Sequence, residues 1–230
     1  MAEHVMAGPK EFSETYVTPG TLDDECAKWM KEIAPYRWRE VEAVEKNAIA
    51  LLVVDMTKPF VDRGPLATPN ARAVLPRVAE LIEAFRKAGR PVLWTCQGHH
   101  SVEHDRGKRL ASWWKTPILE GTDDVEPAAG LEIAEGEKVI FKRRYSGFYQ
   151  TDLELTLRNL DVTQVVIAGV FTHICPFATA FDAFERDLCV YYPADATATV
   201  NRELHLAALK IVAGWCGYVV RAEDIVKALS

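Results

Sequence analysis

Runs of consecutive apolar residues alternate along this chain with stretches in which apolar residues recur every three or four positions. The runs predict buried strands of a parallel sheet at residues 48–54, 91–95, 138–141, 164–170, 188–192 and 218–220. The periodic stretches predict amphipathic helices at residues 71–88, 151–160, 177–187, 202–214 and 222–229. Strands that alternate with helices are typical of an α/β fold, in which helices cover both faces of a parallel sheet.

The first 45 residues do not continue this alternation. Pro19-Gly20 is a turn signal, and the spacing of apolar residues predicts one amphipathic helix over Leu22–Ile33. The segment is too short for a separate domain and too apolar for a solvated tail. We therefore expect residues 1–45 to form an arm that packs on the core or on a neighbouring subunit, and residues 46–230 to form one domain.

Composition narrows the classes of function. The 230 residues are 49% apolar and 26% charged, as in ordinary globular proteins. A net charge of -6 and the lack of a basic run argue against nucleic-acid binding. The apolar runs are too short for a transmembrane helix, and the first 20 residues lack the pattern of a secretory signal. Five cysteines without a CxxC pair indicate free thiols in the cytoplasm and no structural zinc site.

Cys175 stands at a predicted strand-to-helix junction. The strand ends at Val170, the helical spacing starts at Phe177, and Pro176 suits the first helical position. Cys175 is therefore expected at the N-cap, where the helix dipole favours an anion. That position predicts a lowered thiol pKa and a nucleophilic role. The alternative is a small buried cysteine that only packs.

Two further reactive side chains follow predicted strands in the same way. Asp55 comes directly after the strand at residues 48–54, and Lys142 directly after the strand at residues 138–141. Ligands of parallel α/β sheets bind at the carboxyl ends of the strands, so Asp55, Lys142 and Cys175 are expected to share one edge. Taken singly, Asp55 fits a loop carboxylate and Lys142 a surface amine equally well.

An acid, a base and a thiol at one edge support covalent hydrolysis. The Cys175 thiolate would attack a carbonyl carbon, Asp55 would carry the proton to the leaving group, and Lys142 would orient both. The backbone N–H groups of Phe171 and Cys175 are placed to hold the oxyanion. Water would then hydrolyse the acyl-enzyme.

Three segments carry a resemblance to a known family: residues 51–56, 139–148 and 169–175. Over roughly residues 45–229 the chain resembles the isochorismatase-like cysteine hydrolases. The resemblance implies a triad of Asp55, Lys142 and Cys175, and a cis peptide bond between Val170 and Phe171 beside the oxyanion hole. It also implies a three-layer α/β/α sandwich with a six-stranded parallel sheet, assembled into homodimers or homotetramers.

The second-strand loop departs from one branch of that family. Nicotinamidases carry an Asp-x-His metal signature there, whereas this chain reads Gln97-Gly98-His99. His99 and His104 remain conceivable metal ligands, but a polar loop facing the substrate is the favoured interpretation. We therefore expect no metal and no cofactor.

Other residues favour different branches. Gln97, the stretch from Lys142 to Ser146, His173 and His205 resemble isochorismatases, which protonate a vinyl ether and have Gly in place of the cysteine. Residues 144–148, by contrast, resemble ureidoacrylate amidohydrolases, which use the cysteine.

Several residues on the loops at the predicted edge are candidates for the substrate pocket. Aromatic rings beside a few polar groups suit a small planar substrate, although any single ring is as easily explained by packing. Tyr145 is favoured because it lies three residues from Lys142. The candidates are Phe60, Gln97, His99, Trp113, Trp114, Tyr145 and His173.

The sequence thus predicts a cytoplasmic cysteine hydrolase that cleaves a C–N bond in a small amide, carbamoyl or ureido compound through an acyl-thioester on Cys175. One alternative is a vinyl-ether hydrolase with Asp55 as the general acid. Another is a non-catalytic binding member of the same fold. The expected partner is a small molecule, without nucleic acid or membrane.

Overall fold

A computed structural model of the chain describes residues 13–101 and 104–230. Its strands are β1 (Ile49–Val54), β2 (Val92–Gln97), β3 (Lys138–Lys142), β4 (Gln164–Val170), β5 (Cys189–Pro193), β6 (Thr197–Ala198) and β7 (Tyr218–Val220). Its α-helices are α1 (Leu22–Ile33), α2 (Lys58–Val61), α3 (Pro69–Lys87), α4 (Lys108–Trp113), α5 (Leu153–Asn159), α6 (Cys175–Phe184), α7 (Arg202–Trp215) and α8 (Ala222–Leu229). Two 3₁₀ turns, η2 (Ala34–Tyr36) and η3 (Asp123–Val125), complete the described elements.

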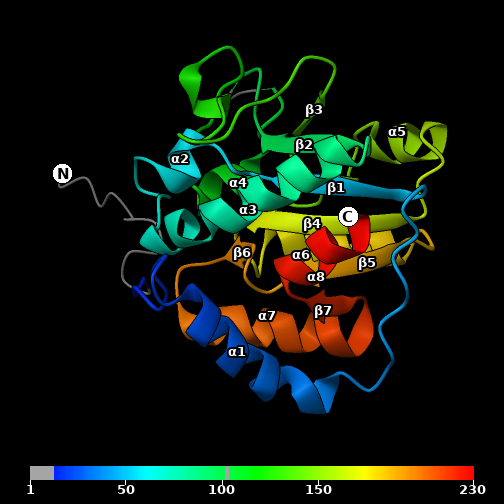
Figure 1. Cartoon of the computed structure of the whole chain (residues 1–230). Helices are drawn as coiled ribbons and strands as arrows, with labels where there is room; N and C mark the ends of the chain where they lie inside the picture. The colour runs from blue at the N-terminus through cyan, green and yellow to red at the C-terminus, as the bar shows by residue number, and fades with distance from the viewer. Residues whose placement is uncertain (1–12, 102–103) are drawn as a thin grey trace.

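The strands form one parallel sheet in the order β3-β2-β1-β4-β5-β7, with the two-residue strand β6 paired to β4 (Figure 1). β1 and β4 lie at its centre and every one of their residues is buried. Burial on both faces explains why these two strands read as continuous apolar runs rather than as alternating patterns.

Helices cover the sheet on both sides. α3 and α8 pack on each other on one face, and α6 packs on β4 and β5 from the other (Figure 1). α7 adjoins α6 and supports α1, whose Trp29 and Ile33 are fully buried. The described part of the N-terminal arm therefore packs on the core of its own chain, while residues 1–12 of the predicted arm lie outside the described residues. In the described part, no helix is long and apolar enough to cross a bilayer.

The predicted three-layer α/β/α sandwich is confirmed, with one correction to the sheet. The six predicted strands form the hydrogen-bonded path, and β6 adds a seventh that two residues are too short to signal by periodicity. α2 and α4 were not predicted, because four and six residues cannot show a helical repeat.

Gly169 lets β4 pass close to β1. Its φ is +124°, and a Cβ atom there would lie 2.0 Å from the Val54 carbonyl oxygen. Val54 immediately precedes Asp55, and Gly169 immediately precedes Val170. The glycine therefore sets the spacing of the two strand ends that carry the reactive residues.

Gly169→Ala is expected to destabilise the fold by at least about 3 kcal/mol, because the new methyl group collides with backbone that cannot move aside. Gly64→Ala is the matched control, since Gly64 also has a positive φ of +89° but open space around its Cβ position. Its cost should stay near about 1 kcal/mol. Urea unfolding measures both, and equal losses would contradict the close approach of β1 and β4.

Candidate active site

Four neighbouring strands bring the reactive side chains together. Lys142 ends β3, Gln97 ends β2, Asp55 follows β1, and Cys175 follows β4 after a short loop. The sheet order β3-β2-β1-β4 places these ends side by side at the carboxyl edge, with Gln97 in register with Lys142. As expected, Asp55, Lys142 and Cys175 lie together at one edge of the sheet.

Asp55 and Lys142 form an ion pair in the interior. Their Oδ2 and Nζ atoms are 2.7 Å apart, and neither side chain has any exposed surface. The Gln97 N–H donates to the other carboxylate oxygen of Asp55 at 2.7 Å. Burial alone would lower the pKa of the Lys142 ammonium, but the Asp55 carboxylate and the Cys175 thiol outweigh it and raise that pKa. Lys142 therefore stays charged.

The Cys175 thiol lies within hydrogen-bonding range of both charges. Burial raises its pKa, the Asp55 carboxylate raises it further, and the Lys142 ammonium opposes them without cancelling their effect. The expectation of a lowered thiol pKa is therefore wrong for the free protein. The N-cap is also one residue earlier than predicted: Ile174 occupies it, and Cys175 and Pro176 begin α6.

The loop before α6 leaves two backbone donors free. The Val170–Phe171 peptide bond is cis, as the family resemblance implied. The Thr172 N–H donates to Ala198 and the Ile174 N–H to Phe171. Within the described part of the chain, the N–H groups of Phe171 and Cys175 have no such backbone acceptor. Their role as the oxyanion hole stays a prediction.

A cavity of about 50 Å³ opens beside the Cys175 thiol. Its wall is mostly apolar, and Phe60 meets Phe171 edge-on at 5.7 Å between ring centroids. Five of the predicted pocket residues line it: Phe60, Gln97, His99, Trp114 and Tyr145. The Trp114 Nε1–H donates to the Tyr145 hydroxyl at 2.9 Å and holds the two rings together.

Two predicted pocket residues do not line the cavity. Trp113 is the last residue of α4, and 72% of its surface is exposed, because the helix directs it outward while Trp114 turns inward. The His173 Nδ1 atom instead pairs with the Thr199 hydroxyl at 2.7 Å. His173 therefore ties the loop before α6 to residues after β6 and does not line the cavity.

His99 is held in a defined tautomer. Its Nε2 atom accepts from the Gln97 amide at 2.9 Å, which leaves the proton on Nδ1, 3.4 Å from Asp105. Burial lowers the His99 pKa, so the ring is neutral. His104 pairs with Ser101 instead. Among residues 13–101 and 104–230, no three His, Cys, Asp or Glu side chains cluster as a metal site.

Sequence reasoning missed six lining residues, which are Leu66, Arg106, Leu110, Thr116, Ile118 and Ile174. The most consequential is Arg106, which is 4% exposed and donates from Nη2 to the Trp114 carbonyl oxygen. Burial lowers its pKa, and no described carboxylate pairs with it. Its position on the loop between β2 and β3, at the carboxyl edge, was the one available signal.

A buried network supports the loop between β4 and α6. The His205 Nδ1 atom lies 2.9 Å from the Thr172 hydroxyl, and the Tyr192 hydroxyl donates to the Thr172 carbonyl oxygen at 2.6 Å. Tyr16 and Trp29 of the N-terminal arm pack against the His205 ring. The arm therefore helps to hold the residue that follows Phe171.

Acid is expected to destabilise the protein through His205. Burial holds its pKa at about 3 in the folded state, against about 6.5 in an unfolded chain. Between these values the unfolded state binds a proton that the folded state does not, so the free energy of unfolding falls as pH drops. From pH 6.5 to 5 the expected loss is about 1–2 kcal/mol.

Urea unfolding of the wild type and His205→Asn at both pH values tests this. The variant should lose that part of the pH dependence, whatever its absolute stability. Asp195, whose pKa burial raises to about 6, contributes with the opposite sign in both proteins. An identical pH dependence in the two proteins would contradict the assignment.

Comparisons with known proteins point to one family. A model of the isochorismatase domain matches residues 49–224. Nicotinamidase 3 of Arabidopsis thaliana is 33% identical over 84% of this chain and 94% of its own length. N-carbamoylsarcosine amidase of Thermoplasma acidophilum has a similar structure, with a TM-score of 0.67 and 30% identity over 76% of this chain and 97% of that one.

Enterobactin synthase component B of Escherichia coli (strain K12) is 33% identical over 81% of this chain. The match spans 65% of the length of that relative. The family match covers more than half of the chain and contains Asp55, Lys142 and Cys175. The chain belongs to the isochorismatase family of hydrolases.

Proposed function

We propose that this protein is a cysteine hydrolase that cleaves a C–N bond in a small amide, carbamoyl or ureido compound. The observation that carries the proposal is the buried contact of Cys175 with both members of the Asp55–Lys142 ion pair, at the wall of a cavity. Relatives named as a nicotinamidase and a carbamoylsarcosine amidase support amide chemistry.

In the proposed reaction the Cys175 sulfur attacks the carbonyl carbon while the thiol proton passes to Asp55. The N–H groups of Phe171 and Cys175 receive the oxyanion. Asp55 then gives the proton to the leaving nitrogen, the C–N bond breaks, and a thioester remains on Cys175. Asp55 next deprotonates a water molecule, whose attack releases the acid and returns the thiol.

The raised thiol pKa fits this order of events. A thiol that is protonated in the free protein delivers its proton to Asp55 when the carbonyl carbon is in place. Lys142 stays charged throughout and offsets the negative charge that moves between carboxylate and sulfur. Lys142 thus stabilises the negative charge whether Asp55 or Cys175 carries it.

Arg106 narrows the proposed substrate to an acid. A buried guanidinium that no described carboxylate neutralises is costly, and a carboxylate on the substrate would offset that cost. The rest of the wall is apolar and aromatic. Together these residues favour a compact amide or ureide with a carboxylate a few bonds from the scissile carbonyl.

Cys175→Ala should reduce kcat on the best substrate of an amide and ureide panel at least about 1,000-fold, because the acyl-enzyme cannot form. Ammonia release measures turnover. Cys96→Ala is the control, since Cys96 is also buried but does not line the cavity. It should keep near wild-type turnover.

A vinyl-ether hydrolase using Asp55 as its acid is the second candidate, favoured by the similarity to a relative named as an isochorismatase. It predicts that Cys175→Ala keeps most of its activity while Asp55→Asn loses it. If the two variants show that pattern of activity with isochorismate as the substrate, the covalent mechanism is contradicted and acid catalysis by Asp55 is supported.

Arg106→Met should raise KM for a carboxylate substrate about 10- to 100-fold, because one charge-assisted pair is lost. It should change KM for the neutral amide analogue of that substrate little. Arg109→Met is the control, because Arg109 is exposed on α4 and does not line the cavity. Equal losses on the acid and on the neutral analogue would show that Arg106 only shapes the loop.

A further inference from the structure

A series of side-chain contacts runs from the buried ion pair into the loop between β2 and β3. The Lys142 Nζ atom lies 3.4 Å from the Gln97 amide oxygen, and the Gln97 amide nitrogen lies 2.9 Å from the His99 Nε2 atom. The His99 Nδ1 atom lies 3.4 Å from one oxygen of Asp105. Arg143, the neighbour of Lys142 in sequence, pairs with the other Asp105 oxygen at 2.8 Å. The contacts therefore leave the end of β3 and return to it.

The hydrogens can be arranged in two ways that keep these contacts while the ring is neutral. A neutral imidazole has one donor and one acceptor nitrogen, and an amide has one donor end and one acceptor end. If the His99 proton is on Nδ1, Nε2 accepts from the Gln97 NH₂ group and the Gln97 oxygen faces Lys142. If the proton is on Nε2, the ring donates, so the Gln97 oxygen turns toward His99 and its NH₂ group turns toward Lys142.

Only the first arrangement suits Lys142. An ammonium has three hydrogens to donate and accepts none. With the Gln97 oxygen facing it, Lys142 can donate to that oxygen and to Asp55, and its third hydrogen is left for the Cys175 sulfur. The Arg144 carbonyl oxygen, also at 3.4 Å, is an alternative acceptor. In the second arrangement an NH₂ group would face the ammonium in the interior, where such a contact is costly.

Asp105 places a negative charge on the Nδ1 side of the ring. Burial alone would raise the Asp105 pKa, but the N–H groups of His100 and Ser101 and the Arg143 guanidinium outweigh it and lower that pKa. The carboxylate is therefore ionised. A separation of 3.4 Å exceeds an ordinary hydrogen bond, so Asp105 acts on the His99 Nδ1–H through its charge. The ring is only 2% exposed, which leaves water little part in the choice of tautomer.

We propose that Asp105 is a positioning residue for Lys142. Its charge holds the His99 proton on Nδ1, and the ring then holds the Gln97 amide with its oxygen toward the ammonium. Asp105 is not among the residues that line the cavity, so it acts without touching the substrate. The effect on turnover rests on the proposed function, whereas the tautomer of His99 does not.

Asp105→Asn tests this, because it removes the charge and keeps the size of the side chain. Glu120→Gln is the matched control. The Glu120 carboxylate pairs with the same Arg143 guanidinium, at 2.6 Å, and otherwise with His100 at 3.3 Å. Both substitutions therefore take one partner from Arg143, but only Asp105→Asn takes the charge from beside the His99 ring.

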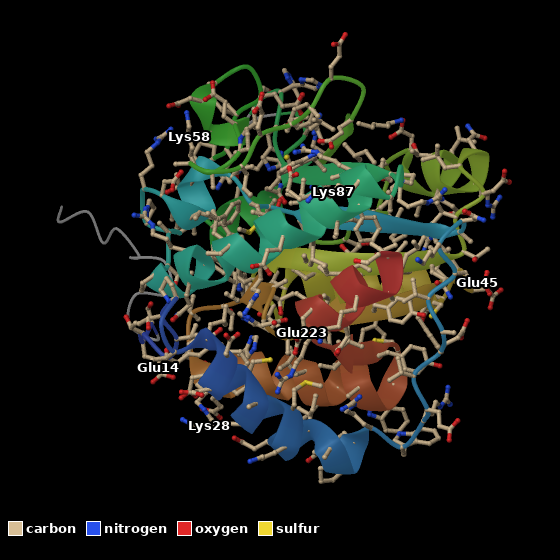
Figure 2. All side chains as sticks on the ribbon, viewed as in Figure 1. Glu14, Lys28, Glu45, Lys58, Lys87 and Glu223 are labelled. Carbon is tan, nitrogen blue, oxygen red and sulfur yellow. The ribbon has the colours of Figure 1, made fainter. Side chains whose placement is uncertain are left out.

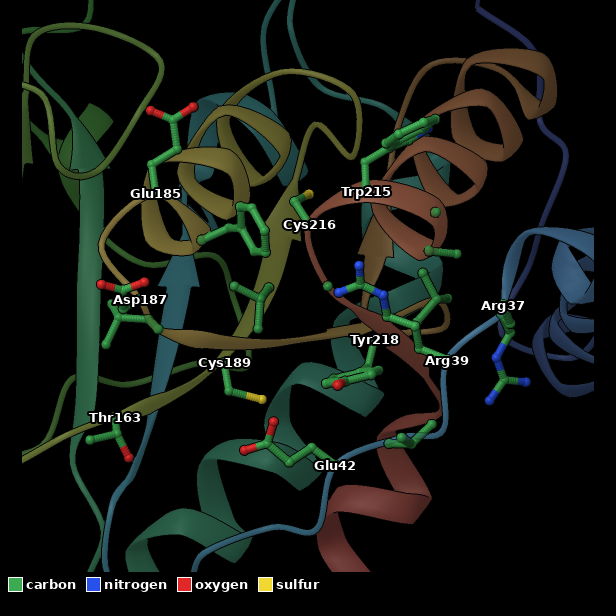
Figure 3. A pocket seen from close by; sticks show the side chains of 18 residues that line it. Arg37, Arg39, Glu42, Thr163, Glu185, Asp187, Cys189, Trp215, Cys216 and Tyr218 are labelled. Atoms are coloured by element: carbon green, nitrogen blue, oxygen red, sulfur yellow. The ribbon is translucent and has the colours of Figure 1, made fainter.

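A second control removes a charge far from the site. Charged side chains are spread over the surface of the molecule (Figure 2), and Asp187 is one of them. It lies in a groove at the amino ends of β4, β5 and β7, at the edge of the sheet opposite the cavity (Figure 3). Its φ of +59° suits Asn as well as Asp, so Asp187→Asn changes charge without backbone strain.

The tautomer can be measured without turnover, from long-range ¹H–¹⁵N correlations of the full chain labelled with ¹⁵N-histidine. The missing signals of His99→Gln assign the ring. The wild type, Glu120→Gln and Asp187→Asn should carry the proton on Nδ1, and Asp105→Asn should show a substantial population with the proton on Nε2. A wild-type ring protonated on Nε2, or an Asp105→Asn ring that keeps the wild-type tautomer alone, would overturn the proposal.

Turnover tests the effect on Lys142. Asp105→Asn should lower kcat on the best amide or ureide about 10- to 100-fold, because a displaced orienting group spoils the reacting geometry, with little change in KM. Both controls should keep the wild-type kcat. In a His99→Gln background, where no ring tautomer is left to select, Asp105→Asn should cost nothing further. The same loss in both backgrounds would show that Asp105 only shapes the loop.

Failure of the proposed function gives a different result. A wild type that turns over no amide or ureide contradicts the proposed function and leaves the tautomer comparison standing. The same variants are then measured on isochorismate, since Lys142 pairs with Asp55 whichever reaction the site performs. A kcat for isochorismate that Asp105→Asn leaves unchanged would again overturn the role of Asp105.

Discussion

The buried ion pair between Asp55 and Lys142 is the interaction on which the rest of the site depends. Two opposite charges with no exposed surface remain stable only if their geometry is good and their other hydrogen bonds are met. The Gln97 N–H meets one of these needs by donating to Asp55. Since Lys142, Gln97 and Asp55 come from three adjacent strands, the pair exists only when β3, β2 and β1 are in register.

The same pair decides what the thiol can do. Asp55 works against ionisation of Cys175 and Lys142 works for it, and with burial added the balance keeps the thiol protonated in the free protein. The close passage of β4 over β1 at Gly169 brings the sulfur to this pair. The N-terminal arm, through Tyr16 and His205, then steadies the loop between Gly169 and Cys175.

The sequence allowed the fold and the reactive residues to be predicted because both depend on regular elements. A strand that is buried on both faces reads as an apolar run, and the residue after it must lie at the carboxyl edge. The pocket could be predicted only in part, because a loop has no periodicity that fixes side-chain directions. Trp113 and Trp114 are neighbours in sequence, yet one is exposed and the other lines the cavity. The thiol pKa was misjudged because a helix terminus is visible in sequence, while contact with a buried carboxylate is not.

Strands and loops therefore have different roles in the candidate site. Strand ends hold the groups that we propose make and break bonds, while the loop between β2 and β3 supplies Arg106 and much of the cavity wall. A hydrolase of this design can change its substrate by changing that loop without disturbing the ion pair. Arg106 is the clearest example here, since it lines the cavity and no described carboxylate pairs with it.

The most direct test of this account is the pH dependence of Cys175 alkylation by iodoacetamide, followed by peptide mass spectrometry in the wild type, Asp55→Asn and Lys142→Met. The account predicts an apparent thiol pKa above the ordinary value of about 8.5 in the wild type. It further predicts a shift downward in Asp55→Asn and upward in Lys142→Met, because the two charges act on the sulfur with opposite sign. An ordinary profile that neither substitution moves would show that Cys175 is not coupled to the ion pair.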